Sequence, residues 1–160
     1  MAEEIVLKAS ATRVQASLEN LGLPVSVRQM PATTRTAQDA ASAIGCTPGQ
    51  IVKSLIFRGS ESGKAYLILA SGPNRVNEAA FGALAGEPIQ RAKPDFVREC
   101  TGFSIGGVPP IGHPARLSTW MDEALLGFET VWAAAGTPES VFAITPKELA
   151  QATMATVIKL

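Results

Sequence analysis

The first residue whose type and position suggest chemistry is Lys53, which interrupts the apolar run of residues 51–57. Alternate side chains of a strand point the same way, so the lysine shares a face with Ile51, Leu55 and Phe57. An ammonium on an apolar face loses its water unless an acceptor meets it. Either the lysine reaches solvent or a carboxylate at the start of the strand, or it stands at a cleft wall and binds a phosphate or carboxylate.

A second candidate is the loop of residues 102–113, in which Gly106, Gly107 and Gly112 flank the pair Pro109-Pro110. The prolines stiffen the middle of the loop, while the glycines permit positive φ angles or close approach of another molecule. Such a loop can present backbone N–H groups to a developing oxyanion or to a water. The alternative is a plain turn between two strands.

Four further residues are candidates without a clear chemical role. His113 is the single histidine, but no Ser or Cys stands at a recognised spacing, which favours a surface or hydrogen-bonded histidine over a general base. Cys46 precedes a helix start, where a thiolate is stabilised, although a small buried cysteine is favoured without a base nearby. Ser71 and Gly72 end an apolar strand, where either a ligand contact or a turn is expected.

The charge balance argues against a protein that coats long nucleic acid. The chain has 14 Lys and Arg against 14 Asp and Glu, so its net charge is zero. Between Gln50 and Trp120, however, eight basic residues stand against five acidic ones, and after Trp120 the numbers are two and five. This bias fits ordinary solvated faces, or else a small anionic ligand or one RNA end bound by the middle segment.

Length and composition predict one compact domain over residues 1–160, since 46% of the residues are hydrophobic and no linker or repeat divides the chain. The longest apolar stretch, residues 65–70, is too short to cross a bilayer, and the first residues lack the basic flank of a secretion signal. We therefore expect a cytoplasmic protein that neither spans nor binds a membrane. The two cysteines indicate neither a disulfide framework nor a zinc site.

Short helices and short strands alternate irregularly along the sequence. Capping residues, terminal glycines and apolar spacing predict helices near residues 10–21, 36–44, 77–84, 94–100 and 145–151. Alternating or continuous apolar runs predict strands near residues 25–28, 51–58, 65–70, 89–91, 117–121, 130–134 and 141–144.

This order favours an α/β (α+β) domain built on a mixed sheet, mostly antiparallel and curled, with short helices on its faces. The turn residues at 60–64 predict that the strands on either side pair antiparallel, and the strand at 65–70 should be central because it is apolar on both faces. No glycine-rich phosphate loop of a common type is present.

Taken together, several segments resemble the YbaK/EbsC-type aminoacyl-tRNA deacylases, which are related to the editing domain of bacterial prolyl-tRNA synthetases. The resemblance covers nearly the whole chain. The segments that carry it are Gly49-Gln50-Ile51-Val52-Lys53-Ser54-Leu55, Leu67-Ile68-Leu69-Ala70-Ser71-Gly72, Thr101-Gly102-Phe103, Gly106-Gly107-Val108-Pro109-Pro110-Ile111-Gly112 and Ala134-Ala135-Gly136.

The resemblance implies a YbaK-like fold and a free-standing enzyme that hydrolyses the ester of a mischarged tRNA, most often tRNA for proline, for translation fidelity. It implies catalytic roles for Lys53 and Gly106, with the lysine holding the terminal phosphate or ribose, the loop amides positioning carbonyl and water, and a vicinal ribose hydroxyl assisting. Implied substrate contacts are Ser71, Gly72, Gly107, Val108, Pro109, Pro110, His113 and Gly136.

The same resemblance implies that no cofactor and no metal take part. The expected partners are the acceptor end of a mischarged tRNA and, in addition, prolyl-tRNA synthetase. Residues 141–142 replace an acidic residue of some members, so the amino acid stays open among alanine, 2-aminobutyrate, serine, threonine and cysteine. The main alternative is a binding module for an aminoacyl-tRNA end or nucleotide that leaves the ester intact, and a weaker one is a thiol enzyme using Cys46.

Overall fold

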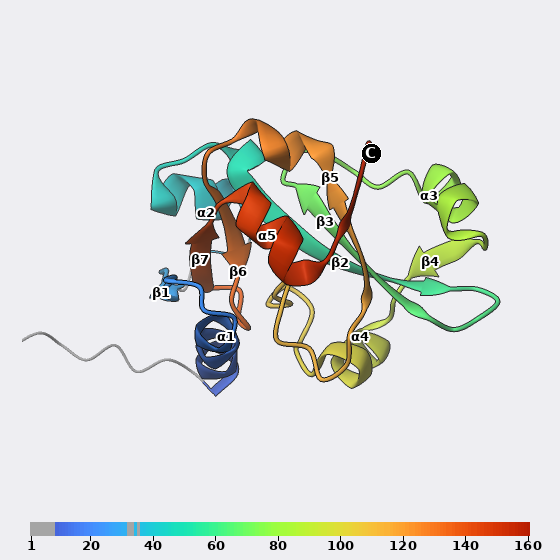
Figure 1. Cartoon of the computed structure of the whole chain (residues 1–160), viewed down its shortest axis with the longest axis horizontal. Helices are drawn as coiled ribbons and strands as arrows, with labels where there is room; N and C mark the ends of the chain where they lie inside the picture. The colour runs from blue at the N-terminus through green and yellow to red at the C-terminus, as the bar shows by residue number, and fades with distance from the viewer. Residues whose placement is uncertain (1–8, 32–33, 35) are drawn as a thin grey trace, which may run out of the picture.

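A computed structural model describes residues 9–31, 34 and 36–160 of the chain. Its α-helices are α1 (Ala9–Asn20), α2 (Ala37–Ile44), α3 (Glu78–Ala85), α4 (Pro94–Thr101) and α5 (Pro146–Thr153). Two 3₁₀ turns, η1 (Pro48–Gln50) and η2 (Glu123–Gly127), complete the helical elements of this part of the chain. Figure 1 shows these short helices distributed around a single curved sheet.

The strands form one mixed sheet in the order β1-β7-β6-β2-β3-β5-β8, with β4 pairing to β2 outside this path. The strands are β1 (Arg28–Gln29), β2 (Ile51–Gly59), β3 (Ala65–Ser71), β4 (Ile89–Arg91), β5 (Ser118–Asp122), β6 (Val131–Ala134), β7 (Ser140–Ile144) and β8 (Thr156–Ile158). Antiparallel pairs are β1–β7, β2–β3, β2–β4 and β6–β7, whereas β2–β6, β3–β5 and β5–β8 are parallel. The predicted mixed, mostly antiparallel sheet is therefore confirmed.

The centre of the sheet is the hairpin that the sequence predicts. Strands β2 and β3 pair antiparallel with Leu55 opposite Ile68, and both occupy middle positions in the sheet. In β3 every residue from Tyr66 to Ser71 is buried, because helices and loops cover both faces. The two central strands thus form a rigid base for the residues at their ends.

The strand predicted at residues 25–28 is wrong in most of its length, because the described strand β1 is only Arg28–Gln29. The side chain of Gln15, on α1, accepts a hydrogen bond from Val27 N at 2.7 Å and donates one to the Val25 carbonyl at 3.1 Å. A helix side chain therefore satisfies these main-chain groups in place of a neighbouring strand. The short elements β8 and η2 carry no strong pattern, and the sequence does not predict them.

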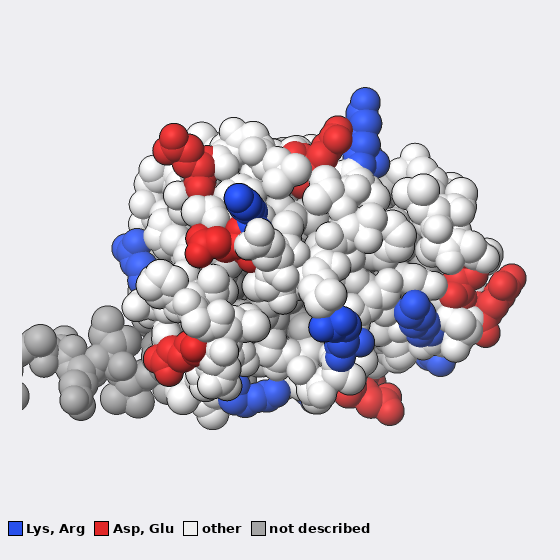
Figure 2. Space-filling model, in the orientation of Figure 1, with Lys and Arg blue, Asp and Glu red and all other residues white. Residues whose placement is uncertain are grey.

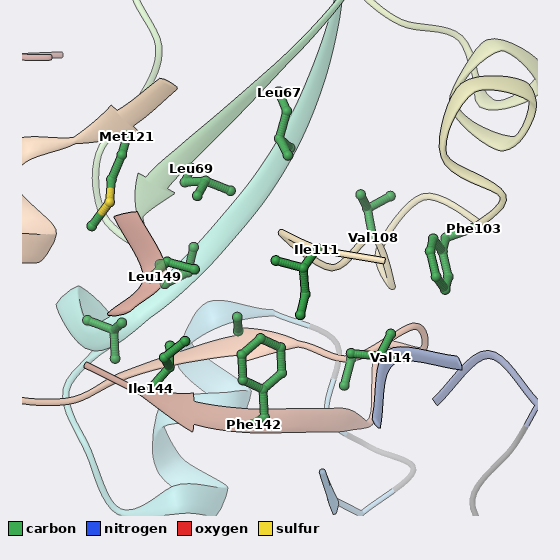
Figure 3. Packing of buried hydrophobic residues seen from close by; sticks show 14 of the residues in the cluster. Val14, Leu67, Leu69, Phe103, Val108, Ile111, Met121, Phe142, Ile144 and Leu149 are labelled. Carbon is green, nitrogen blue, oxygen red and sulfur yellow. The ribbon is translucent and has the colours of Figure 1, made fainter. Parts of the chain in front are cut away.

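The main core lies where helix α1, the sheet and the loop after α4 meet. Figure 3 shows Val14 of α1, Phe142 of β7, and Val108 and Ile111 of the loop pointing into the same apolar interior. A second cluster, on the other face of the hairpin, contains Phe57, Tyr66, Ile68, Phe81 and Ile89. The glycine- and proline-rich loop is thus part of the packed core.

One edge of β2 has two different partners and a gap between them. Strand β6 pairs with Ile51 and Val52, and β4 pairs with residues 57–59, so residues 53–56 of this edge have no strand beside them. The Ile56 carbonyl accepts a hydrogen bond from Ala92 N at 3.2 Å across the end of the gap. An open interval in a central strand gives a ligand access to the middle of the sheet.

Candidate functional site

A cavity of about 380 Å³ lies at this open interval. It has the size typical of small-molecule sites. Its walls are mostly apolar and come from β2, β4, β6, β7, α2, α4 and the loop of residues 105–108. The lining residues that matter for chemistry are Lys53, Ser54, Arg91, Gly106, Val108 and Trp132.

Lys53 is half-buried, and its Nζ donates a hydrogen bond to the Asn74 carbonyl at 2.6 Å. Strand alternation places its side chain on the same face as Leu55 and Phe57, which belong to or pack on the second apolar cluster. Burial lowers the pKa of this ammonium, and the positive charges of Arg75 and Arg91 lower it further, while Asp122 acts in the opposite direction. The polar partner that the sequence predicts for Lys53 is therefore the neutral carbonyl of Asn74.

A buried carboxylate holds the turn that supplies this carbonyl. Asp122 is 1% exposed, and its Oδ2 accepts hydrogen bonds from Asn74 Nδ2 at 2.8 Å and from Ser71 N at 3.0 Å. Its Oδ1 accepts one from Ala124 N at 3.0 Å. Asp122 thus holds Asn74 in place, and the Asn74 carbonyl in turn holds the Lys53 ammonium. No sequence motif predicts this role of the aspartate.

The glycine loop is shaped by two glycines with different requirements. Gly106 has a φ angle of +92°, a backbone conformation that L side chains rarely adopt. At Gly107 a Cβ atom would lie 2.7 Å from the Gly136 carbonyl oxygen and 2.7 Å from Thr137 Cα. The Gly107 carbonyl accepts a hydrogen bond from Gly136 N at 2.9 Å, so the two backbones are locked together.

These contacts narrow which amides of the loop can serve a ligand. Gly107 N donates to the Ser104 carbonyl at 3.1 Å, and Pro109 and Pro110 have no N–H. Within residues 106–110, Gly106 and Val108 line the cavity. Unlike the prolines they have an N–H group, and unlike that of Gly107 it is not engaged by the Ser104 carbonyl. Because Val108 and Ile111 are buried in the core, as Figure 3 shows, the loop is held in a fixed position.

Three predicted substrate contacts do not line the cavity but pack against neighbouring segments of the fold: Ser71, Gly72 and Gly136. The Ser71 hydroxyl donates to the Gly49 carbonyl at 2.6 Å, and a Cβ on Gly72 would stand 2.3 Å from the Pro48 carbonyl oxygen. Both contacts pin the turn that leads into β2. Gly136 has a φ angle of +95° and packs against the backbone of Ser10. Direct contact of these residues with a substrate stays a prediction.

His113 and Pro110 line a different cavity, between α1 and the region where α5 ends, and not the one that contains Lys53. The imidazole meets the Phe103 ring edge-on at 6.1 Å between centroids. Burial lowers the pKa of His113, which keeps the ring neutral at physiological pH. His113 is therefore not part of the lining that contains Lys53, and a role in specificity stays a prediction.

Cys46 does not line the cavity, and burial raises the pKa of its thiol, which disfavours the thiolate. The thiol-enzyme alternative therefore gains no support from the geometry. Among the residues that the structure describes, no group of three or more His, Cys, Asp or Glu residues could hold a metal ion. A search of the same residues finds no helix able to cross a membrane.

Of the six lining residues that matter for chemistry, three are not predicted from the sequence as site residues. Arg91 ends the short strand β4, Ser54 follows the lysine, and Trp132 lies in β6 beneath the guanidinium of Arg28, 5.2 Å from the ring centroid. The basic bias of the middle segment is the one signal that includes Arg91. Figure 2 shows basic and acidic side chains interspersed on the viewed face, without a broad field of one sign.

The fold and the site define a class of protein: a mixed α/β domain with a ligand cavity at an open strand edge, where a cation and a core-anchored glycine loop face apolar walls. The sequence profile of the aminoacyl-tRNA editing domain matches residues 31–152. The chain belongs to this family, and the predicted resemblance is confirmed at that level.

Comparisons with individual proteins agree. The uncharacterized protein YwhH of Bacillus subtilis (strain 168) is 34% identical over 125 residues, which cover 78% of this chain and 79% of that protein. The proline–tRNA ligase of Desulfitobacterium hafniense is 34% identical over 91 residues, 56% of this chain but 16% of that enzyme. A crystal structure assigned provisionally as a trans-editing enzyme for prolyl tRNA synthetase superposes with a TM-score of 0.93 and 52% identity, covering 97% of this chain and 98% of that one.

Proposed function

We propose that this protein is a trans-acting aminoacyl-tRNA deacylase that hydrolyses the ester of a mischarged tRNA, with tRNA for proline carrying a small wrong amino acid as its substrate. The observation that carries the proposal is that Lys53, Gly106 and Val108 line one mostly apolar cavity. The family supplies the reaction class, and the similarity to a prolyl-tRNA trans-editing enzyme and to proline–tRNA ligases supports the choice of tRNA.

In the proposed reaction, water adds to the ester carbonyl, the bond between carbonyl carbon and ribose oxygen breaks, and the ribose oxygen leaves with a proton. Lys53 anchors the terminal phosphate or ribose. The N–H groups of Gly106 and Val108 face the oxyanion that forms on the carbonyl. Among the described residues, the cavity lining contains no His, Cys or carboxylate to act as base, which fits assistance by the vicinal ribose hydroxyl. An ester is an activated bond, so orientation and oxyanion stabilisation suffice.

The size and charge of the protein support recognition of the acceptor end alone. A cavity of about 380 Å³ accommodates a small acyl group together with part of the terminal nucleoside. The net charge of zero and the mixed surface in Figure 2 argue against many phosphate contacts. We propose further that residues 1–160 act as one editing domain and that prolyl-tRNA synthetase releases the mischarged tRNA that this domain receives.

The test is a single-turnover deacylation panel with the full chain. tRNA for proline is charged with alanine, 2-aminobutyrate, serine, threonine, cysteine or proline, and the surviving ester is followed beside a protein-free control. We expect rapid loss of at least one small wrong amino acid and survival of prolyl-tRNA. A shift of the RNA in a binding assay, with every ester decaying at its background rate, would instead support the binding module.

A further inference from the structure

The described cavity wall is positively charged and has no acidic residue. Lys53 and the exposed Arg91 line it, and the charge of Arg75, in the loop after β3, acts on Lys53 as well. None of the described lining residues is an Asp or Glu. A ligand in this cavity therefore meets cations, the hydroxyl residues Thr34, Thr36 and Ser54, and apolar side chains, but no described carboxylate.

Two carboxylates of neighbouring elements, Asp122 and Asp39, stand outside the described lining. Asp122 of β5 acts on Lys53, but its oxygens accept the hydrogen bonds of Ser71, Asn74 and Ala124, and it is buried outside the lining. Asp39 of α2 lies at the helix start, where it accepts a hydrogen bond from Thr36 N at 3.2 Å. On the β6 side, the guanidinium of Arg28 is stacked over Trp132.

Bound substrate would not neutralise the wall. The terminal phosphodiester of a tRNA brings one negative charge, against the two lining cations Lys53 and Arg91 and the charge of Arg75 that acts on Lys53. The amino acid of an aminoacyl ester carries its α-amino group on the carbon next to the reacting carbonyl. A protonated α-amine placed there would lose water to apolar walls and face like charges, and both effects disfavour it.

We infer that the site selects esters whose acyl group is uncharged, so that an aminoacyl-tRNA reacts as its neutral α-amine and an α-hydroxyacyl-tRNA is an equally good substrate. This inference rests on the proposed function and names the chemical form of its substrate. An α-amino group has an ordinary pKa of about 7.7, so the reactive form is a minor species in mildly acidic solution.

The experiment compares two esters of the same tRNA and nearly the same size, alanyl-tRNA and lactyl-tRNA, in which a hydroxyl replaces the amine. The value of kcat/KM is measured between about pH 5.7 and 7.7 and corrected for spontaneous hydrolysis. We expect the rate on alanyl-tRNA to rise roughly 50-fold over this range, following the neutral fraction of an amine with a pKa of about 7.7. The ratio of the alanyl rate to the lactyl rate should rise by the same factor.

A variant with one fewer positive charge in the cavity wall provides a second test. Arg91→Gln removes one cation from the wall, and Arg116→Gln is the matched control because Arg116 lines the other cavity. In the Arg91 variant the alanyl rate at pH 5.7, relative to the same variant's rate at pH 7.7, should exceed the wild-type ratio several-fold, while the shape of the lactyl profile stays unchanged. The control should follow the wild type for both esters.

Identical pH profiles for the two esters, or a faster reaction of alanyl-tRNA at the acidic end, would overturn the inference and leave the deacylase in place. Hydrolysis of neither ester above background at any pH would overturn the proposed function together with the inference. The two failures are therefore distinguishable in one data set.

Discussion

The side chain of Lys53 illustrates what one residue in an unexpected place can indicate. An ammonium on an apolar strand face predicts a polar partner and a cleft, and the lysine is half-buried, bonded to the Asn74 carbonyl and part of the cavity wall. The identity of the partner could not be predicted, because the Asn74 turn is held by Asp122, 48 residues further along the chain. Contacts of this kind depend on the tertiary fold and leave no local pattern.

Gly107→Ala tests whether the loop is locked to the turn at Gly136. The new methyl group would lie 2.7 Å from two backbone atoms, so the loop must shift, and we expect a loss of about 1–3 kcal/mol in the free energy of unfolding. Denaturant unfolding measures it. Gly127→Ala is the matched control, because a Cβ at that position meets nothing within 4 Å. Equal stability of the two variants would refute the packing argument.

At the scale of elements, the β2–β3 hairpin is tied to the segment between α3 and β4 by one carboxylate. Glu87 accepts hydrogen bonds from Glu61 N, Ser62 N, the Ser62 hydroxyl and the Tyr66 hydroxyl, at 2.6–3.0 Å. These bonds, above all that of the Ser62 hydroxyl, lower the pKa of Glu87 to about 2. The sequence predicts the turn at residues 60–64 but contains no signal for this partner.

The Glu87 contacts predict a pH dependence of stability. The carboxyl has a pKa near 4.5 in the unfolded chain and about 2 in the folded one, so its contribution is complete above about pH 4.5 and is lost as the pH falls toward 2. Glu87→Gln should be less stable than wild type at neutral pH and should lose less stability across this window. Chemical unfolding at several pH values checks this.

The control for this experiment is Glu99→Gln, which makes the same change on the exposed surface of α4. It should keep the wild-type pH profile. If the Glu87 variant also keeps that profile, the hydrogen-bond cluster does not stabilise the folded hairpin.

At the scale of the whole molecule, helix α1 belongs to the same core as the site loop, although it precedes the family match at residues 31–152. Val14 and Leu18 are fully buried in the cluster that contains Val108 and Ile111. The helix spacing of these apolar residues predicts that face from sequence alone. The open interval of β2, in contrast, depends on where β4 and β6 end, and strand ends are set by tertiary pairing.

Leu18→Ala tests whether α1 is an integral part of the fold. Removing a fully buried leucine side chain should lower the free energy of unfolding by about 2–5 kcal/mol. Leu21→Ala provides the control, since Leu21 is 49% exposed, and its effect should stay within about 0.5 kcal/mol. Similar small effects of both variants, in thermal or denaturant unfolding, would mean that α1 packs weakly and contributes little to the core.

The most direct measurement is single-turnover hydrolysis by Lys53→Ala of the mischarged tRNA that the wild type prefers, with Lys147→Ala, an exposed lysine of α5, as control. Circular dichroism and unfolding first establish that each variant is folded. We predict that Lys53→Ala loses at least about 100-fold in rate, the scale for misplacing a substrate against the reacting groups, while Lys147→Ala keeps the wild-type rate. A folded Lys53→Ala protein with wild-type activity would contradict the role of this lysine.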